Sequence, residues 1–468
     1  VMQSTEDNHI KVACRVRPTS TKESSQGTRQ CIHTGEHNEI VINSKPEPRT
    51  FTFDFVADQN ASQDDVFRNI GEPITSSCIQ GYNGTILCYG QTGSGKTYTI
   101  FGPDANTSKD TTGCTTHCGL VPRALDYIWQ HISREKDSST AEKSFSCRCS
   151  FYEIYQEKVF DLLDSAGGSI GGLSVREDAT RGVYVEGCTE EEVCSPADAN
   201  RVLSVGYRNR HVGETAMNRE SSRSHAVFQL IIDTTEEKNG VRTCRTAKFS
   251  QIDLAGSERQ KNTNATGERL KEASQINKSL SALGNVINAL ADISGHGTRR
   301  HVHYRDSKLT FLLRDSLGGN SKTVLVATVS PADVCFAETL STLKFAQRAK
   351  SIKNSAVVNE ETSGTVLALR NEILALKAKL NEVEQQGVLD ISCSAMDDVV
   401  ASHQAEDTFE NGGLLDLIRE IKNATGLLQQ TTEEQKKSLS FDEAIQSFKM
   451  KLKFREREIA SLKQRVAE

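Results

Sequence analysis

The chain has 468 residues, more than one hydrophobic core usually supports, so at least two structural units are expected. Its formal net charge of −6 argues against a nucleic-acid binder as the first interpretation. Thirteen cysteines without a regular framework, and a sequence without a secretory signal or a long apolar span, predict reduced thiols and a cytosolic protein.

Charge and turn-forming residues are unevenly distributed along the chain. Residues 51–200 hold 11 basic and 22 acidic side chains, whereas residues 251–350 hold 14 basic and 9 acidic ones. The second stretch can therefore present a basic face to an acidic polymer. All eight prolines lie at or before Pro331, and 27 of the 32 glycines precede residue 351. We therefore expect a folded domain up to about residue 350 and a helix-permissive region after it.

Strand and helix patterns alternate along the first 350 residues. The strand candidates are 10–18, 85–89, 145–163, 226–233 and 248–254, and the helical candidates include 66–70 and 267–291. This order predicts an α/β fold with a central, mainly parallel sheet flanked by helices. Ser250 and Gln251 interrupt one strand with polar side chains, which puts the packing of that strand in question.

A complete phosphate-loop pattern follows the strand candidate at 85–89. It consists of Gly90, Gln91, Thr92, Gly93, Ser94, Gly95, Lys96 and Thr97. Glycines let backbone N–H groups converge on phosphates where a Cβ would clash. Lys96 can reach the β and γ phosphates, the Thr97 hydroxyl can hold Mg²⁺, and the following helix directs its positive end at the same anion. The sequence therefore predicts a P-loop NTPase fold that binds a nucleoside triphosphate with Mg²⁺.

Two downstream clusters carry side chains suited to a γ-phosphate. The first runs from Asn218 to His225 and concentrates hydroxyls and a guanidinium, and the second runs from Asp253 to Glu258. An Asp at a strand end suits the Mg²⁺ shell, and the N–H of Gly256 suits a γ-phosphate oxygen. Arg223 and Glu258 can pair when both loops close and so enclose the attacking water. Taken alone, each cluster is more often an exposed cap or a turn.

Together these motifs resemble the kinesin motor domain over about residues 9–360. Further segments in the family's order are Arg15 to Pro18, Tyr98, Asn277 to Gly284, Tyr304 to Thr310 and Asp315 to Asn320. The stretches from Gly256 to Gln260 and from Leu309 to Ser316 look most similar to the kinesin-twelve subfamily. The resemblance implies ATP and Mg²⁺ as ligands and microtubules as the partner.

The resemblance also implies roles for individual residues. Arg15, Pro18 and Tyr98 would enclose the adenine, and Arg17 would belong to the same nucleotide site. Thr97, Ser222 and Asp253 would hold Mg²⁺, Asp253 through water. The residues that would sense the γ-phosphate and position water are Ser221, Ser222, Arg223, Gly256 and Glu258. Those that would contact microtubules are Lys261, Lys278, Arg299, Arg300, Arg305 and Lys308, although a solvated surface charge is the alternative for each of these.

The resemblance places a neck linker at residues 351–362, after a motor domain at 1–350. Ile352, Val357 and Val358 would dock on the motor in the ATP state, and Asn354 and Asn359 would latch it by hydrogen bonds. Docking would then couple the presence of the γ-phosphate to displacement of whatever follows. A passive linker is the alternative.

The region after the linker carries two heptad patterns. Apolar residues at spacings of three and four predict a short helix over 363–386, and a second series predicts a helical or coiled-coil segment over 413–468 that continues beyond the last residue. Between them, residues 388–412 contain six acidic residues and no basic one, so 387–412 is predicted to be a flexible break. Each heptad segment can also be an ordinary amphipathic helix packed on the globular domain.

The functional expectation is an ATP-driven microtubule motor, plus-end directed, acting in the cytoplasm and cytoskeleton at the mitotic spindle. We expect a homo-oligomer joined by its coiled coil, with neither nucleic acid nor membrane as partner. A GTPase switch is disfavoured because Leu280 stands where a guanine-reading aspartate is needed. A microtubule binder that does not step would be favoured by loss of Arg223, Gly256 or Glu258, and all three are present. A nucleic-acid translocase is disfavoured because the basic stretch lacks interleaved aromatics.

Overall fold

The computed structural model describes residues 9–25, 27–103, 116–138, 142–164, 172–178, 181–217, 221–238, 241–258, 268–296 and 301–364. One compact unit comprises residues 7–236 and 244–360, and the described part of a second comprises 237–238, 241–243 and 361–364. The predicted acidic break, the second heptad segment and all but the first two residues of the first heptad helix lie outside the described residues.

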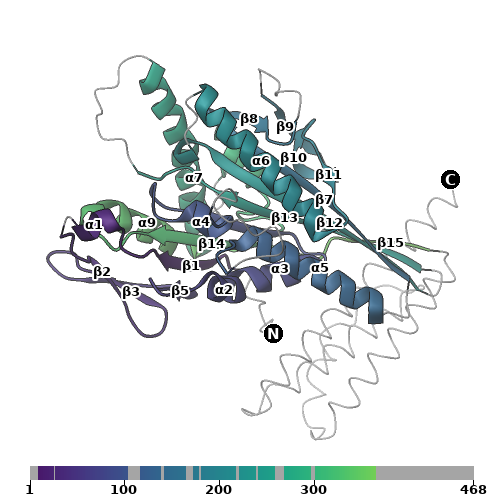
Figure 1. Ribbon diagram of the computed structural model, residues 1–468, viewed down its shortest axis with the longest axis horizontal. Coiled ribbons are helices and arrows are strands. Elements are labelled where there is room, and N and C mark those ends of the chain that lie inside the picture. The colour runs from purple at the N-terminus through teal and green to yellow at the C-terminus, as the bar shows by residue number, and fades with distance from the viewer. Residues whose placement is uncertain are drawn as a thin grey trace, which may run out of the picture. The chain divides into compact units, whose positions relative to one another are not determined.

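A ten-stranded mixed sheet forms the centre of the fold, in the order β11-β7-β12-β13-β6-β14-β1-β5 (Figure 1). The strands are β1 Lys11–Val16, β5 Phe55–Ala57, β6 Gly84–Tyr89, β7 Glu142–Tyr155, β11 Glu191–Glu192, β12 His225–Lys238, β13 Val241–Asp253 and β14 Lys322–Val329. Off this path, β8 Lys158–Asp161 pairs with β7, and β15 Glu360–Gly364 pairs with β13.

Only part of this sheet is parallel. The pairs β5–β1, β1–β14, β14–β6 and β6–β13 are parallel, and their central strands are apolar and buried on both faces. The pairs β11–β7 and β7–β8 are antiparallel. Only two residues separate β12 from β13, a connection that only antiparallel neighbours permit. The sequence predicted a mainly parallel sheet. The sheet is instead mixed, because the long hairpin of β12 and β13 introduces antiparallel strands on one side of it.

Helices cover both faces of the sheet and bury two hydrophobic clusters. One cluster packs side chains of α3 Glu72–Ile79, α5 Leu120–Ser138 and α6 Pro196–Met217 against the sheet. The other packs side chains of α7 Glu268–His296, α8 Lys308–Leu312 and α9 Phe336–Ala349. The short helix α4 Lys96–Ile100 directly follows β6. The phosphate loop therefore lies at the carboxyl end of a central parallel strand, between two helical layers.

Smaller elements complete the described chain. The helical candidate at 66–70 is a continuous helical stretch in which α2 Gln63–Val66 and α3 flank a π-helical turn, η1 Phe67–Gly71. Ser62 and Asp65 form a capping box at its start. The other elements are α1 Thr21–Ser25, a three-stranded sheet of β2 Ile32–Thr34, β3 Glu39–Ile42 and β4 Arg49–Thr52, a β9 Ser174–Asp178 and β10 Gly182–Glu186 hairpin, and 3₁₀ turns at η2 Ser221–Arg223, η3 Tyr304–Asp306 and η4 Asp333–Cys335.

The polar pair in β13 is accommodated by the mixed sheet. Ser250 accepts a hydrogen bond at 3.1 Å from the side chain of Gln229 on β12, so the two hairpin strands share a polar contact. Gln251 is buried and aligned with Ile86 of β6. The strand is thus formed despite its polar residues. Among the described helices, none is both long enough and apolar enough to cross a lipid bilayer.

Candidate functional site

The phosphate loop is held in a shape that its glycines permit. Gly93 and Gly95 have φ values of 77° and 100°, in the left-handed region that favours glycine. Gly90 faces β14, where a Cβ would lie 2.2 Å from the carbonyl oxygen of Thr328. Ser94 also reaches β14, with its hydroxyl 2.6 Å from that of Thr328. The loop is therefore fixed against the neighbouring strand, and a Cβ at Gly93 or Gly95 would meet nothing within 4 Å.

Lys96 is the buried cation of this loop. Its Nζ donates to the carbonyl oxygens of Gly90 and Gln91, both at 2.9 Å. Burial lowers the pKa of Lys96, while the carboxylates of Asp253 and Glu258 act in the opposite direction. An ammonium has three N–H donors, so among the described contacts one remains for an oxyanion. The predicted phosphate-binding lysine thus lies inside the loop, with two carboxylates near enough to affect its charge.

Asp253 lies at the end of β13 and is joined to the phosphate loop. The hydroxyl of Thr97 donates to its Oδ2 at 2.7 Å. Arg210 on α6 reaches the same oxygen at 3.3 Å, and both side chains of this ion pair are almost fully buried. Arg210 also contacts the backbone oxygen of Ser224 at 3.4 Å. Arg210 thereby links Ser224, in the cluster from Asn218 to His225, to Asp253. Sequence reasoning missed this role because Arg210 lies outside every motif.

The side chains around Thr97 fit a Mg²⁺ ion with its water shell. Oδ1 of Asp253 is buried and has no hydrogen-bond partner among the described residues. Mg²⁺ keeps several waters and is bound by one or two carboxylates together with substrate phosphates. One buried carboxylate oxygen beside a threonine hydroxyl meets that requirement. Ser222, the third predicted ligand, lies in η2 and is half-buried, and its role as a ligand stays a prediction.

The loop after β13 closes on the phosphate loop and on η2. The N–H of Gly256 donates to the carbonyl oxygen of Ser222 at 2.9 Å. Glu258 accepts hydrogen bonds from Thr92, from the backbone N–H at 2.8 Å and from the hydroxyl at 2.5 Å. The structure therefore brings Glu258 and Gly256 to the phosphate loop. The pairing of Glu258 with Arg223 stays a prediction, and Asn218 and the side chain of Ser221 lie outside the described part of the chain.

Arg15 and Tyr98, both predicted to enclose the adenine, lie against each other. The Arg15 guanidinium lies over the Tyr98 ring, 5.3 Å from its centroid, and donates to Gln63 at 2.8 Å and Thr99 at 3.0 Å. Tyr98 is 39% exposed, so its ring can take a planar base. Gln63 also donates to the carbonyl oxygen of Tyr98 at 2.8 Å. This glutamine is a second positioning residue that no sequence motif indicated.

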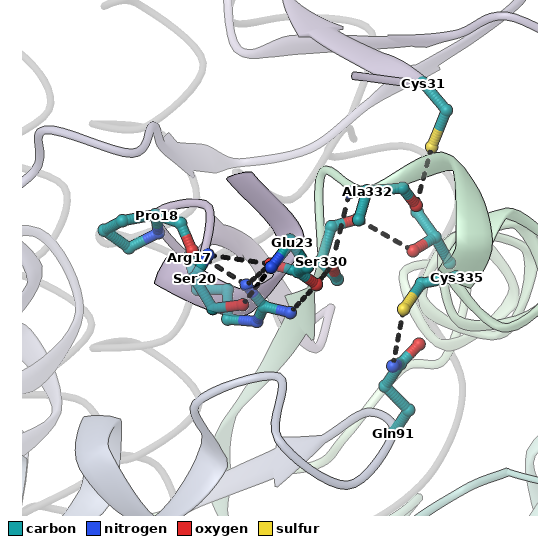
Figure 2. Close-up of polar contacts among 10 residues, drawn as sticks. Arg17, Pro18, Ser20, Glu23, Cys31, Gln91, Ser330, Ala332 and Cys335 are labelled. Atoms are coloured by element: carbon teal, nitrogen blue, oxygen red, sulfur yellow. Dashed lines mark hydrogen bonds and ion pairs between the residues drawn. The ribbon is translucent and has the colours of Figure 1, made fainter. Parts of the chain in front are cut away.

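Arg17 points toward Glu23 (Figure 2). The two side chains form a bidentate ion pair, with N–O distances of 2.7 and 2.5 Å, and Arg17 also donates to the carbonyl oxygen of Pro18. This guanidinium lowers the pKa of Glu23 to about 2. Pro18 itself is exposed. The nucleotide contacts of Arg17 and Pro18 stay predictions.

Gln91 ties the phosphate loop to the segment before α9. Its amide nitrogen lies 3.1 Å from the sulfur of Cys335, and Figure 2 shows the two side chains pointing toward each other. On the other side of the same turn, the thiol of Cys31 donates to the carbonyl oxygen of Ala332 at 3.4 Å. The turn that leads into α9 is therefore fastened to the phosphate loop and to the strand region near Cys31.

The predicted microtubule contacts are only partly described. Lys261, Arg299 and Arg300 lie outside the described residues. Lys278 is exposed on α7, and Lys308 begins α8. Arg305 pairs with Glu177 at 2.9 Å, and Arg314 pairs with the same carboxylate at 2.5 Å. These two arginines lower the pKa of Glu177, Arg314 more than Arg305, and together the three side chains keep a net positive charge.

Ile352 and Asn354, which follow α9, are buried within the unit of residues 7–236 and 244–360. Ile352 is fully buried, and the Asn354 side chain accepts from the N–H of Gly318 at 2.8 Å. Its amide nitrogen donates to the carbonyl oxygens of Ser316 and Ser321 at 3.0 and 2.7 Å. The buried Asn354 amide thus has both its oxygen and its nitrogen hydrogen-bonded to backbone groups, and its role as a latch stays a prediction.

A second asparagine fastens the end of this segment. Asn359 donates to the carbonyl oxygen of Thr246 and to Asn83, both at 3.0 Å, and Glu360 pairs with Arg245 at 2.8 Å. The prediction for Val357 is wrong, because its side chain is 46% exposed while its backbone N–H donates to Asn320. β15 continues to Gly364, so residues 363 and 364 are in a strand instead of the predicted helix.

Comparisons with known proteins point to one family. A family model described as the kinesin motor domain matches residues 15–352. The human Kinesin-like protein KIF15 is 47% identical over 461 residues, covering 98% of this chain and 32% of that protein. Kinesin-like protein KIN-12E of Arabidopsis thaliana is 48% identical over 386 residues, covering 82% of this chain and 30% of that protein. The chain thus spans about a third of the length of these relatives.

A solved structure is similar to a large part of this chain. It is titled "Structure of a fast kinesin: Implications for ATPase mechanism and interactions with microtubules". The match has a TM-score of 0.69 and 42% sequence identity, and it covers 76% of this chain and 96% of the other. The similarity therefore extends from sequence to three-dimensional arrangement.

Proposed function

Since this chain belongs to the kinesin motor family, we propose that it is a microtubule-stimulated ATP hydrolase that moves along microtubules. The family and its kinesin-twelve branch, predicted from the sequence motifs, are confirmed by the relatives, and so is the P-loop NTPase fold. ATP hydrolysis would be coupled to docking of the linker at 351–362, with the motor unit ending near residue 350.

The observation that carries this proposal is the position of β13. Its last residue, Asp253, contacts Thr97 of the phosphate-binding region. Near its start, Arg245 pairs with Glu360, and Thr246 donates its N–H to the carbonyl oxygen of Asn359. One strand thus connects Thr97 to residues 359 and 360, which supports a motor in which phosphate chemistry would displace the linker.

The proposed reaction is phosphoryl transfer from ATP to water. Lys96 and the loop N–H groups would bind the β and γ phosphates, and Arg15 and Tyr98 would hold the adenine. The N–H of Gly256 would turn from Ser222 to a γ-phosphate oxygen, and Glu258 would leave Thr92 to pair with Arg223 beside the attacking water. Positioning and charge stabilisation, without a covalent intermediate, would supply the rate enhancement.

Thr97, Ser222 and Asp253 are the residues that would hold Mg²⁺, Asp253 through a water molecule. The ion would supply charge neutralisation between the β and γ phosphates. Arg210 and Thr97 would orient the Asp253 carboxylate by binding its Oδ2. This division of roles is supported by the buried Arg210–Asp253 pair and by the free Oδ1 described above.

The proposed track is the microtubule, an acidic polymer. The basic balance of residues 251–350 supports this partner, as do the exposed Lys278 on α7 and the positively charged cluster of Arg305 and Arg314 around Glu177. Lys261, Arg299, Arg300 and Lys308 complete the proposed surface. Binding that depends on such charges weakens as salt rises.

We further propose plus-end-directed movement, a role at the mitotic spindle and self-association through the heptad segments after residue 363. Support for direction comes from the order of motor, linker and predicted coil along the chain. Gliding of polarity-marked microtubules over attached protein tests it, since minus-end motion would contradict the proposal. Sedimentation at increasing protein concentration tests self-association, because a constant sedimentation coefficient would exclude it in the range examined.

The experiment that tests the activity is ATP turnover with and without polymerised tubulin. We expect stimulation by microtubules in the wild-type chain and loss of turnover in Glu258→Ala. Equal turnover with and without microtubules would exclude the motor. Retained turnover in Glu258→Ala would leave a motor whose water is positioned by other groups.

A further inference from the structure

His225 connects three elements that the proposed mechanism treats separately. It begins β12 directly after η2, and its imidazole is buried. The backbone N–H of Ala255 donates to its Nδ1 at 3.0 Å, and its Nε2 lies 2.8 Å from the hydroxyl oxygen of Ser279 on α7. The ring therefore spans from the loop that carries Gly256 to the helix that carries Lys278.

The direction of both hydrogen bonds follows from their partners. A backbone N–H can only donate, so Nδ1 is the unprotonated acceptor. A neutral ring then carries its proton on Nε2, which donates to the oxygen of Ser279. Burial lowers the pKa of His225 to about 3, and the positive charges of Arg210 and Lys96 act in the same direction. The ring therefore has one tautomer at neutral pH.

The two partners of His225 lie next to residues of the proposed nucleotide site and of the proposed microtubule-binding surface. Ala255 is fully buried and precedes Gly256, whose N–H currently binds the carbonyl oxygen of Ser222. Ser279 is buried, whereas its neighbour Lys278 is exposed. Hydrogen bonds weaken steeply beyond about 3.5 Å, so a shift of the loop by roughly 1 Å must either carry α7 along or break a bond.

We propose that His225 is a positioning residue that couples the loop at Ala255 and Gly256 to the orientation of α7, through its bond to Ser279. This inference rests on the proposed function, and it names side chains through which nucleotide state and microtubule affinity influence each other. Such coupling is a ratio of affinities and is reciprocal, so it can be measured from the microtubule side alone.

The test measures microtubule affinity of the 468-residue chain with ADP and with a non-hydrolysable ATP analogue. The ratio of the two dissociation constants is the coupling factor. The loss of one hydrogen bond corresponds to a factor of about five in an equilibrium constant. We therefore expect the coupling factor of Ser279→Ala to lie about fivefold closer to one than that of the wild-type chain. His225→Asn, which keeps an acceptor near Ala255 but cannot reach Ser279, is expected to show the same change.

Matched variants separate coupling from a purely structural role. Ser279→Thr keeps the hydroxyl and should retain the wild-type ratio, and so should Ser281→Ala, an exposed position on the same helix. Thermal unfolding is recorded for every variant. If Ser279→Ala lowers the unfolding temperature but leaves the ratio unchanged, the bond is structural only and the inference is overturned. If the wild-type ratio is itself one, the proposed function fails, and this inference fails with it.

Discussion

Thr97 and Asp253 are 156 positions apart in the chain, yet the Thr97 hydroxyl donates to the Asp253 carboxylate at 2.7 Å. The bond joins the first turn of α4 to the end of β13, and Arg210 binds the same carboxylate oxygen from α6. Three elements therefore converge on one buried carboxylate, and changing that carboxylate should affect metal binding before anything else.

Asp253→Asn is expected to lower ATP turnover by at least about 100-fold and to raise the Mg²⁺ concentration needed for half-maximal turnover. An amide keeps the shape of the side chain but removes the charge that Mg²⁺ and Arg210 require. A Mg²⁺ titration of turnover measures both effects. Asp306→Asn, on the exposed turn η3, serves as control and should match the wild-type chain without microtubules. An unchanged Mg²⁺ dependence in Asp253→Asn would contradict the assigned role.

Gly256→Ala should inactivate the enzyme through crowding. A Cβ at this position would lie 2.3 Å from the Thr92 hydroxyl oxygen and 2.5 Å from both carboxylate oxygens of Glu258. The side chains of Thr92 and Glu258 must therefore move, and because Glu258 is displaced from its position we expect turnover to fall by about 100-fold or more. Gly284→Ala on α7 is the matched control, since nothing lies within 4 Å of its added Cβ. Steady-state turnover checks the pair, and equal activities would show that the loop tolerates the displacement.

Asn354→Ala should release the linker. Its side chain exchanges hydrogen bonds with Gly318, Ser316 and Ser321, so truncation leaves buried backbone groups unpaired at a cost of about 2–3 kcal/mol to docking. We expect gliding velocity to fall at least about tenfold while ATP turnover falls less.

The control for this linker variant is Val357→Ala, because Val357 is 46% exposed. A fluorescence pair placed on the linker and on the main unit should report undocking in Asn354→Ala and none in Val357→Ala. Equal docking in the two variants would exclude Asn354 as a latch.

The burial of His225 predicts a specific loss of stability in acid. Its folded-state pKa of about 3 lies below the ordinary value of 6.5, so the unfolded chain takes up a proton first as pH falls. The stability that the buried, neutral His225 contributes is fully present above pH 6.5 and is lost as the pH falls from 6.5 to 3. From pH 8 to pH 5 this amounts to about 2 kcal/mol in the free energy of unfolding.

Urea unfolding of the wild-type chain and His225→Gln at both pH values measures this loss. Glutamine does not titrate, so the variant should lose about 2 kcal/mol less than the wild-type chain over that interval, whatever its starting stability. Equal losses would mean that the imidazole becomes protonated in the folded protein.

Local motifs allowed the nucleotide site to be predicted, because glycines, Lys96 and Thr97 act within one short loop. Asp253 and Glu258 were predicted for the same reason. Arg210 and Gln63 were not, since an isolated polar residue on a helix has no local signal, and only the packing of α6 and α2 brings them to Asp253 and Tyr98. Contacts made across the fold are decided by topology.

The sheet and the linker illustrate the same limit. The alternating pattern predicted β1, β6, β7, β12 and β13, but it missed the central strand β14 and the pairing of β12 with β13, which makes the sheet mixed. For the linker, apolar character predicted burial of Ile352 correctly and of Val357 wrongly. Val357 donates its backbone N–H to Asn320, and a backbone contact cannot be predicted from the polarity of the side chain.

The most direct test of the central claim is ATP turnover by the 468-residue chain as polymerised tubulin is added, in parallel with Glu258→Ala. Turnover by the wild-type chain should rise with microtubule concentration to a plateau at least about tenfold above the level without microtubules, and Glu258→Ala should stay near zero throughout. Turnover by the wild-type chain that is independent of microtubules would contradict that claim.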